Sequence, residues 1–390
     1  MSAPAAACLP DLKSATGSAG SPSKLQEGEF AYRWSSTVRA LYSTYFETCL
    51  VKMVLSNGTV GWGEAQAPLA PGVAATIVED LLRPVLIGQA FDGTRERIEF
   101  LWDEMYATMR VRGQAGGFMV DAMAGVDIAL WDLAGQLQEM PVSKLIAGVL
   151  AKSSVPAYLS GLTGASIEHK VEFAATNYKN GFRLFKLFHE SDAASLLALL
   201  DKLRDRLGAD SKFAVDGLWR FDPQEAAVFG RELDRRKAHW FEAPLMPESV
   251  IDHKDLADFL QTPLALGESY RTIFEMEPFF NNHVFQFLQP DLGRTGITGG
   301  LRLATRAAAL GMEVVPHVSI AMAPQIAAAM HFAAAAPACH ICEFNPAVVE
   351  IANRYSPQPI VMENARYIIS GSPGLGVSIL EKNLCRDIVR

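Results

Sequence analysis

The chain has 390 residues, a length that favours a large domain plus a smaller one over a single simple core. Its hydrophobic content of 49%, charged content of 20% and net charge of −8 are typical of a globular enzyme and argue against a general nucleic-acid-binding protein. No apolar run approaches the length of a membrane-spanning helix, so we expect no contact with a membrane.

Residues 1–28 are rich in Ala, Ser, Gly and Pro and lack the charged and apolar regions of a secretory signal. We interpret them as a flexible extension or an extra inserted loop. The five cysteines are widely scattered, and the CxxC spacing of Cys339 and Cys342 has no second pair that would complete a structural zinc site. Buried thiols in a reducing compartment are the better interpretation, which predicts a cytoplasmic protein.

Residues 29–150 are predicted to form a small α+β domain. Two alternating apolar runs flank Asn57 and Gly58, a pair typical of the type I′ turn of a β-hairpin. Apolar residues at three- and four-residue spacing then predict helices over about 75–107 and 119–138.

From residue 151 to residue 350 the pattern changes to short strands with helical segments between most of them. The eight candidate strands are 155–161, 182–188, 212–217, 238–244, 264–269, 284–290, 312–318 and 338–344. This alternation indicates parallel βαβ units and predicts an α/β fold, a TIM-like barrel of seven or eight strand–helix units. An open doubly wound sheet is the alternative, but no glycine-rich dinucleotide loop follows the first strand. Residues 351–390 are expected to pack back on the small domain and complete it as a cap.

Three successive predicted strands end in carboxylates at matched, evenly spaced positions, namely Asp216, Glu242 and Glu268. The C-terminal ends of barrel strands meet at one mouth, where catalytic residues gather. Three carboxylates there would repel one another unless a cation neutralised them, and hard oxygen ligands suit Mg²⁺. Any one of them alone could be a surface charge or a helix cap, but the matched spacing favours a metal site.

The remaining strand ends carry candidates for proton transfer. Asp291 and His317 end the next two strands, and a carboxylate that accepts from one histidine nitrogen makes the other nitrogen a usable general base. Glu343 ends the last strand and is either a rim charge or a proton donor. Lys186 ends the second strand, where a lone lysine is more often a solvated charge.

These residues, in this order, resemble the enolase superfamily, specifically its mandelate racemase and muconate lactonizing enzyme group. The resemblance covers nearly the whole chain beyond about residue 40. The matching segments are GWGEA, VDIALWDLAG, GFRLFK, VDG, WFEAPL, LGES, QPDLGRTGITG, PHV, CEF and PGLGV.

The resemblance implies abstraction of a proton α to a carboxylate, with the resulting enediolate stabilised by Mg²⁺. It implies that Asp216, Glu242 and Glu268 bind the metal and that His317 with Asp291 is the base. It also implies that Glu343 stabilises or protonates the enediolate, while Lys186 contacts the substrate carboxylate.

The sequence departs from the family pattern at Phe188, where many members carry a second lysine that acts on the opposite face of the substrate. Phenylalanine cannot accept a proton, so chemistry with one base is favoured. We therefore predict a carbon–oxygen lyase that dehydrates an acid sugar, an aldonate or aldarate, to a 2-keto-3-deoxy acid.

Two alternatives remain open. The first is a racemase, epimerase or cycloisomerase in which His189 or a water serves the other face, and the second is a non-catalytic, metal-stabilised binding protein. Candidate contacts to the small carboxylate substrate are His189, Arg112, Arg294 and Tyr45, and the resemblance implies a homo-oligomer.

Overall fold

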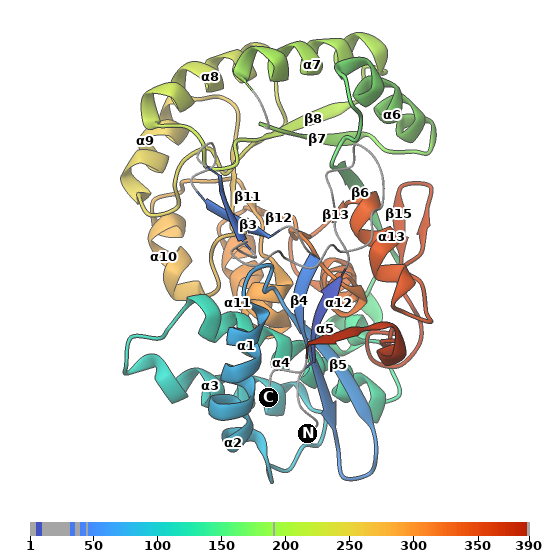
Figure 1. Cartoon of the computed structure of the whole chain (residues 1–390). Coiled ribbons are helices and arrows are strands. Elements are labelled where there is room, and N and C mark those ends of the chain that lie inside the picture. The colour runs from blue at the N-terminus through green and yellow to red at the C-terminus, as the bar shows by residue number, and fades with distance from the viewer. Residues whose placement is uncertain (1–4, 10–31, 36–39, 44–45, 190–191, 388–390) are drawn as a thin grey trace, which may run out of the picture.

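The computed structural model describes residues 5–9, 32–35, 40–43, 46–189 and 192–387. Figure 1 shows the early helices and strands, in blue and teal, gathered below a ring of strands and helices in green to orange. Within the described residues, no helix is both long enough and apolar enough to cross a bilayer.

The lower region is built on a four-stranded antiparallel sheet in the order β16-β1-β4-β5. Its strands are β1 (Ala5–Leu9), β4 (Phe46–Val54), β5 (Val60–Ala65) and β16 (Cys385–Asp387). The hairpin predicted around Asn57 is therefore present. Its turn is not type I′, because residues 55–59 form a longer loop in which only Gly58 takes a positive φ, of 86°.

Helices cover this sheet, and they differ from the prediction in one place. The helical pattern expected over 75–107 is broken at Gly88, where φ is 78°. The helical elements are α1 (Pro71–Ile77), η1 (Val78–Leu82), α2 (Arg83–Leu86), α3 (Arg95–Arg110), α4 (Gly117–Leu137), α5 (Val142–Ala147) and η2 (Gly148–Leu150).

Helix α4 joins the two regions. It is buried along nearly its whole length because most of its residues are apolar and they lie on every side of the helix, although three aspartates are buried with them. It crosses β5 where Gly63 meets Gly125, and a Cβ at Gly63 would lie only 1.9 Å from the Gly125 carbonyl oxygen. On the barrel side, Asp127 accepts hydrogen bonds from the backbone and hydroxyl of Thr298.

The upper region has eight parallel strands among the described residues, and all eight coincide with predicted ones. They are β6 (Ser154–Ser160), β7 (Leu184–Phe188), β8 (Lys212–Asp216), β9 (Phe241–Glu242), β10 (Leu264–Leu266), β11 (Phe287–Leu288), β12 (Glu313–Val314) and β13 (Cys342–Phe344). The helices that follow them are α6 (Ile167–Lys179), α7 (Ala193–Arg206), α8 (Pro223–Arg235), α9 (Val250–Phe259), α10 (Ile273–Asn281), α11 (Leu292–Ala309), α12 (Ala323–Ala335) and α13 (Pro346–Arg354).

Ladders run continuously from β12 through β6, and β13 pairs with β6. Within the described chain no ladder joins β12 to β13, where Val314 forms a single bridge with Cys339. The predicted TIM-like barrel is thus present, with its ring incompletely closed at this one point.

The C-terminal segment was predicted to pack on the cap. Its strand Arg366–Ile368 pairs instead with β6 of the barrel, and its last strand pairs with the capping sheet. After β14 (Met362–Glu363), β15 (Arg366–Ile368) and η3 (Glu381–Asn383), strand β16 pairs with β1. Of the N-terminal segment 1–28, only β1 is described, and the rest lies outside the described residues. A separate hairpin of β2 (Tyr32–Ser35) and β3 (Ala40–Ser43) lies toward the barrel strands in Figure 1.

Candidate functional site

Three carboxylates meet at the mouth of the barrel. Asp216 and Glu242 end β8 and β9, and Glu268 follows β10 by two residues. One oxygen of each lies within 4.8 Å of the others, and all three side chains are buried. This spacing and donor set suit a divalent metal ion.

Unusual backbone conformations flank each of these carboxylates. Leu218, near Asp216, has φ 52°, and Ala243, next to Glu242, has φ 40°. Gly267 has φ 146°, and a Cβ there would lie 2.6 Å from the backbone nitrogen of Gln289. Left-handed conformations of non-glycine residues cost free energy and cluster at functional sites, which supports a functional role for this mouth.

The oxygens of the three carboxylates differ in the number of hydrogen bonds that they accept. Glu242 Oε2 accepts hydrogen bonds from Trp240 Nε1 at 2.9 Å and Gln289 Nε2 at 2.7 Å. Asp216 Oδ1 accepts one from the backbone of Leu218 at 2.9 Å. Glu268 Oε1 is buried and has no hydrogen-bond partner in the described structure. A buried carboxylate oxygen without a donor is expensive, so this atom is suited to binding a cation.

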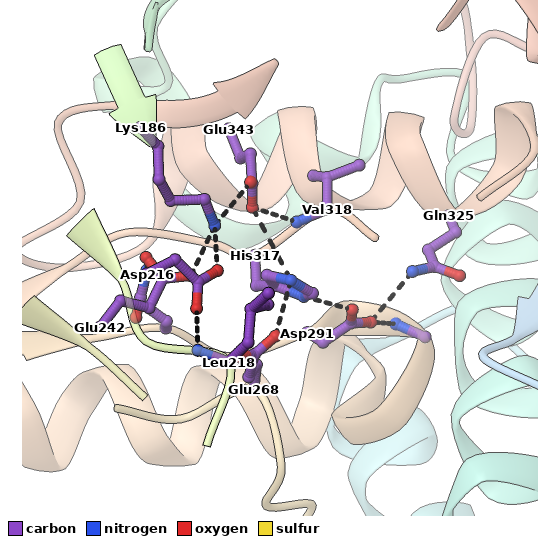
Figure 2. A network of polar contacts seen from close by, with 12 residues as sticks. Lys186, Asp216, Leu218, Glu242, Glu268, Asp291, His317, Val318, Gln325 and Glu343 are labelled. Atoms are coloured by element: carbon purple, nitrogen blue, oxygen red, sulfur yellow. Dashed lines mark hydrogen bonds and ion pairs between the residues drawn. The ribbon is translucent and has the colours of Figure 1, made fainter. Parts of the chain in front are cut away.

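Lys186 extends from β7 into the carboxylate cluster, as Figure 2 shows. Its Nζ lies 2.5 Å from Glu242, 2.9 Å from Glu343 and 3.6 Å from Asp216. Burial lowers the pKa of Lys186, but the negative charges of Glu242 and Glu343 raise it well above its ordinary value. Lys186 is therefore a buried, charged lysine rather than the solvated one that its sequence position alone suggests.

His317 sits between two carboxylates. Its Nδ1–H donates to Asp291 Oδ2 at 2.8 Å, and its Nε2 lies 2.8 Å from Glu268 Oε2 (Figure 2). Asp291 also accepts hydrogen bonds from Gln325 Nε2 and from the backbone of Gly293, each at 2.9 Å. These contacts hold the imidazole in one orientation and leave Nε2 facing the cluster.

Glu343 lies across the mouth, near His317 and Lys186. Its Oε2 accepts a hydrogen bond from the backbone of Val318 at 2.9 Å and lies 4.0 Å from His317 Nε2. Burial raises the pKa of Glu343, but the charges of Lys186 and His317 outweigh it and hold this pKa at about 2. Glu343 is therefore ionised in this arrangement.

The predicted substrate contacts that the structure describes are not part of the carboxylate cluster. His189 is buried against Phe221 and Phe229, with ring centroids 4.7 and 5.8 Å away, in a cavity of about 690 Å³ beside α7 and α8. Burial lowers its pKa, and the charges that act on it include Arg220 rather than the carboxylate cluster. This placement argues against His189 as a replacement for the second base.

The side chains of the other predicted contacts make no hydrogen bond or ion pair with the cluster in the described chain, or they lie outside the described residues. Arg112 is exposed in the turn after α3, and within the described chain its side chain makes no hydrogen bond or ion pair with the mouth. Arg294 is half-buried and acts electrostatically on Asp121. Tyr45 lies outside the described residues. Tyr42 on β3 is near enough to the cluster for its charges to act on it. Burial raises the pKa of Tyr42 most, and the charges of Asp216 and Glu268 raise it further.

Several supporting residues were missed by the sequence reasoning. Gln289, which binds Glu242, and Gln325, which binds Asp291, are the clearest examples. A buried amide inside an otherwise apolar strand was the available signal for Gln289. For Gln325 there was none, because it lies on a helix that follows the strand ends by several residues.

Comparison with known proteins gives two family matches. Residues 41–147 match the family described as "Mandelate racemase / muconate lactonizing enzyme, N-terminal domain", and residues 170–383 match "Enolase C-terminal domain-like". Both matches fall on the two regions of the fold described above.

Individual relatives are similar over most of the chain. An arabinonate dehydratase of Saccharolobus solfataricus is 28% identical over 90% of this chain and 94% of its own. A D-galactarolactone cycloisomerase of Agrobacterium fabrum is 29% identical over 85% and 88%. A crystal structure of an enolase superfamily member from Agrobacterium tumefaciens is 30% identical, covers 97% of this chain and 96% of its own, and superposes with a TM-score of 0.89.

Proposed function

Because the chain belongs to the enolase superfamily, in its mandelate racemase and muconate lactonizing enzyme group, we propose that it is a Mg²⁺-dependent dehydratase of an acid sugar. The observation that carries this proposal is the distribution of proton-transfer groups. His317 faces the carboxylate cluster, whereas Phe188 occupies the position of a second lysine and His189 packs against Phe221. One-sided proton chemistry favours elimination over racemisation.

The metal site in this proposal consists of Asp216, Glu242 and Glu268. Their mutual distance and the partnerless Glu268 Oε1 fit a small divalent cation. When bound, Mg²⁺ would stabilise the negative charge that develops on the substrate carboxylate.

Each remaining group has a separate role. His317, once it has given up the proton on Nε2, removes the α proton through that nitrogen, while its Nδ1–H stays bonded to Asp291. Lys186 orients the substrate carboxylate through its charged Nζ. Glu343, which is ionised in the site without substrate and lies 2.9 Å from that Nζ, stabilises or protonates the carboxyl oxygen once it has taken up a proton. The preorganised charges of this buried site act more strongly than they would in water.

The second half of the reaction removes the β-hydroxyl. In a syn elimination the protonated His317 returns its proton to that hydroxyl, which leaves as water. The α and β carbons become doubly bonded, and the resulting enol loses its O–H proton and takes up a proton at C3 to give the 2-keto-3-deoxy acid. The substrate thus loses one water and is neither oxidised nor reduced.

Cycloisomerisation of a sugar lactone is the second candidate. It begins with the same abstraction of the α proton, but the departing β-oxygen is the ring oxygen and stays attached to the product. The 29% identity to the D-galactarolactone cycloisomerase supports keeping this reaction in the test.

The test is proton NMR in D₂O with Mg²⁺ on a panel of aldonates, aldarates and their lactones. A new, deuterated C3 methylene with net loss of water supports the dehydratase. The same signal from a lactone without loss of water supports the cycloisomerase. Exchange of the α proton alone favours an epimerase, and no reaction across the panel despite demonstrated Mg²⁺ binding leaves a metal-stabilised binding protein.

A further inference from the structure

Glu64 is a fully buried carboxylate at the boundary between the cap and the barrel. It comes near the end of β5, yet it accepts hydrogen bonds from the backbone of Met322 at 2.8 Å and of Gln325 at 3.2 Å, both at the start of α12. Thr48 Oγ1 on β4 donates to it as well, at 2.8 Å. The capping domain therefore supplies a side chain to a barrel helix.

This contact replaces a cap that α12 lacks. The residue at its N-cap position is Met322, whose side chain cannot accept a hydrogen bond, and Pro324 in its first turn has no N–H. The first N–H groups of a helix need acceptors from outside the helix, and a carboxylate is the favoured acceptor at that end. Glu64 thus sets the position of the first turn of α12.

That turn carries the side chain that holds the general base. Gln325 Nε2 donates to Asp291 Oδ1 at 2.9 Å, and Asp291 Oδ2 accepts from His317 Nδ1 at 2.8 Å (Figure 2). The fit around the Gln325 amide is close, because a Cβ on Gly293 would lie 2.3 Å from its Oε1. The Gln325 amide therefore has little room to move on the Gly293 side, so its contact with Asp291 depends on where α12 begins.

A second residue of the capping domain contacts the first turn of α11, which follows Asp291. The backbone N–H of Gln66 donates to the carbonyl oxygen of Gly293 at 2.7 Å. Glu64 and Gln66 together hold both segments on which the Asp291 side chain depends, the start of α12 and the start of α11. The barrel does not complete this arrangement with its own residues.

We propose that Glu64 is a positioning residue for the His317–Asp291 pair, acting through Gln325, so that docking of the capping domain sets the orientation of the base. The proposal rests on the proposed function for the role of His317. The hydrogen-bond path itself does not depend on which substrate is used. Glu64 does not touch the reacting atoms and acts only through α12.

The first test uses a spectroscopic signal that needs no substrate. In the Mg²⁺-saturated full chain with ¹⁵N-labelled histidine, the Nδ1–H proton of His317 is assigned by its absence in His317→Asn. We expect Glu64→Ala and Gln325→Leu each to speed exchange of this proton with water by about tenfold or more. In Glu64→Gln, whose side-chain oxygen still accepts from both N–H groups, exchange stays within about twofold of wild type.

The matched control is Asp127→Ala. Asp127 is an equally buried cap carboxylate that accepts from a barrel backbone, that of Thr298, but it does not contact α12. In Asp127→Ala the Nδ1–H proton of His317 should exchange with water at the wild-type rate when the two proteins are compared at the same folded fraction. Equal acceleration in Asp127→Ala and Glu64→Ala, or no acceleration in a folded Glu64→Ala, would overturn the proposal.

The second test uses activity on whichever substrate the panel identifies. Glu64→Ala and Gln325→Leu should each lower kcat by about tenfold with KM within about twofold, and the double variant should lose no more than either alone. Additive losses of kcat in the double variant would show that Glu64 and Gln325 act independently, which would contradict the proposal. A panel without turnover would defeat the proposed function, while the exchange measurement would still decide the role of Glu64.

Discussion

The capping domain and the barrel mouth both bury carboxylates, but they treat them in opposite ways. In the cap, Asp127 and Asp132 each accept two hydrogen bonds from N–H or O–H donors, all between 2.6 and 2.9 Å. At the mouth, Asp216, Glu242 and Glu268 face one another, and Lys186 is a cation shared by the first two.

The difference distinguishes carboxylates that are buried to hold the fold together from carboxylates that are buried in a candidate active site. A carboxylate that accepts several hydrogen bonds contributes to a fixed arrangement of the chain, because these donors offset part of its desolvation. Carboxylates that face one another repel, and such a cost is typically retained where a site binds a cation or a substrate. Four predictions test this contrast, in order of decreasing effect.

The largest effect is expected for His317→Asn. The variant keeps a side chain of similar size but removes the ring nitrogen that accepts the α proton, so exchange of that proton in D₂O should fall by about 10³-fold. Mg²⁺-dependent thermal stabilisation should persist. Retention of exchange in this variant would show that another group is the base.

The second prediction concerns the cap and the effect of pH. Burial raises the pKa of Asp127 from 3.8 to about 6, so the folded state binds this proton more tightly than the unfolded state. Wild type therefore loses stability as pH rises from about 4 to 6, and the contribution is constant outside that window. Relative to wild type, Asp127→Asn should gain about 3 kcal/mol across it, as measured by urea unfolding at each pH.

If the relative stability of Asp127→Asn shows no slope between pH 4 and 6, Asp127 is not a buried ionisable group of this kind. The same slope in Asp92→Asn would point to a general charge effect instead, since Asp92 is exposed and its pKa is lowered by hydrogen bonds from Thr94. The comparison thus separates burial from overall charge.

The third prediction concerns metal binding. At a hundred times its Kd, Mg²⁺ should stabilise wild type by about 2.7 kcal/mol, and EDTA should remove this gain. Glu268→Gln should abolish the response, because it removes the charge of a proposed ligand whose Oε1 has no hydrogen-bond partner in the described structure. Asp132→Asn neutralises a cap carboxylate and should leave the response intact. Calorimetric titration with Mg²⁺ measures binding to each variant. An equal loss of binding in Glu268→Gln and Asp132→Asn would contradict the distinction between the mouth and the cap.

The smallest effect is expected at His189. Its ring stacks on Phe221, and its Nδ1 is buried with no partner in the described structure, so His189→Phe should preserve the packing. We expect kcat within about twofold of wild type in a steady-state assay. A fall as large as that of His317→Asn would restore His189 as the second base.

Much of the barrel and its mouth was predictable from sequence. Strand periodicity located all eight parallel strands, and the strand ends carry Lys186, Asp216, Glu242 and Asp291 in the order expected. This works because the C-terminal ends of parallel strands must meet at one edge, whatever the connecting loops do. The Cys339–Cys342 pair is also buried, in accord with the prediction of inert thiols.

The failures have physical reasons of their own. The 75–107 helix was overextended because apolar spacing continues across Gly88, whose positive φ breaks the backbone. The type I′ turn failed because a dipeptide does not determine loop length. For His189, the position one residue past a strand end did not reveal which side of the loop the ring would occupy.

The sequence by itself determined the alternation of strands and helices, the family and the residues that meet at the mouth, because these depend on local periodicity and position along strands. Only the tertiary structure decided that Lys186 is buried among three carboxylates and that His189 is turned into the α7–α8 cavity. It alone also decided that Glu64 caps a helix more than 250 residues away. Contacts of this kind depend on how separately folded surfaces dock, and local sequence does not encode that geometry.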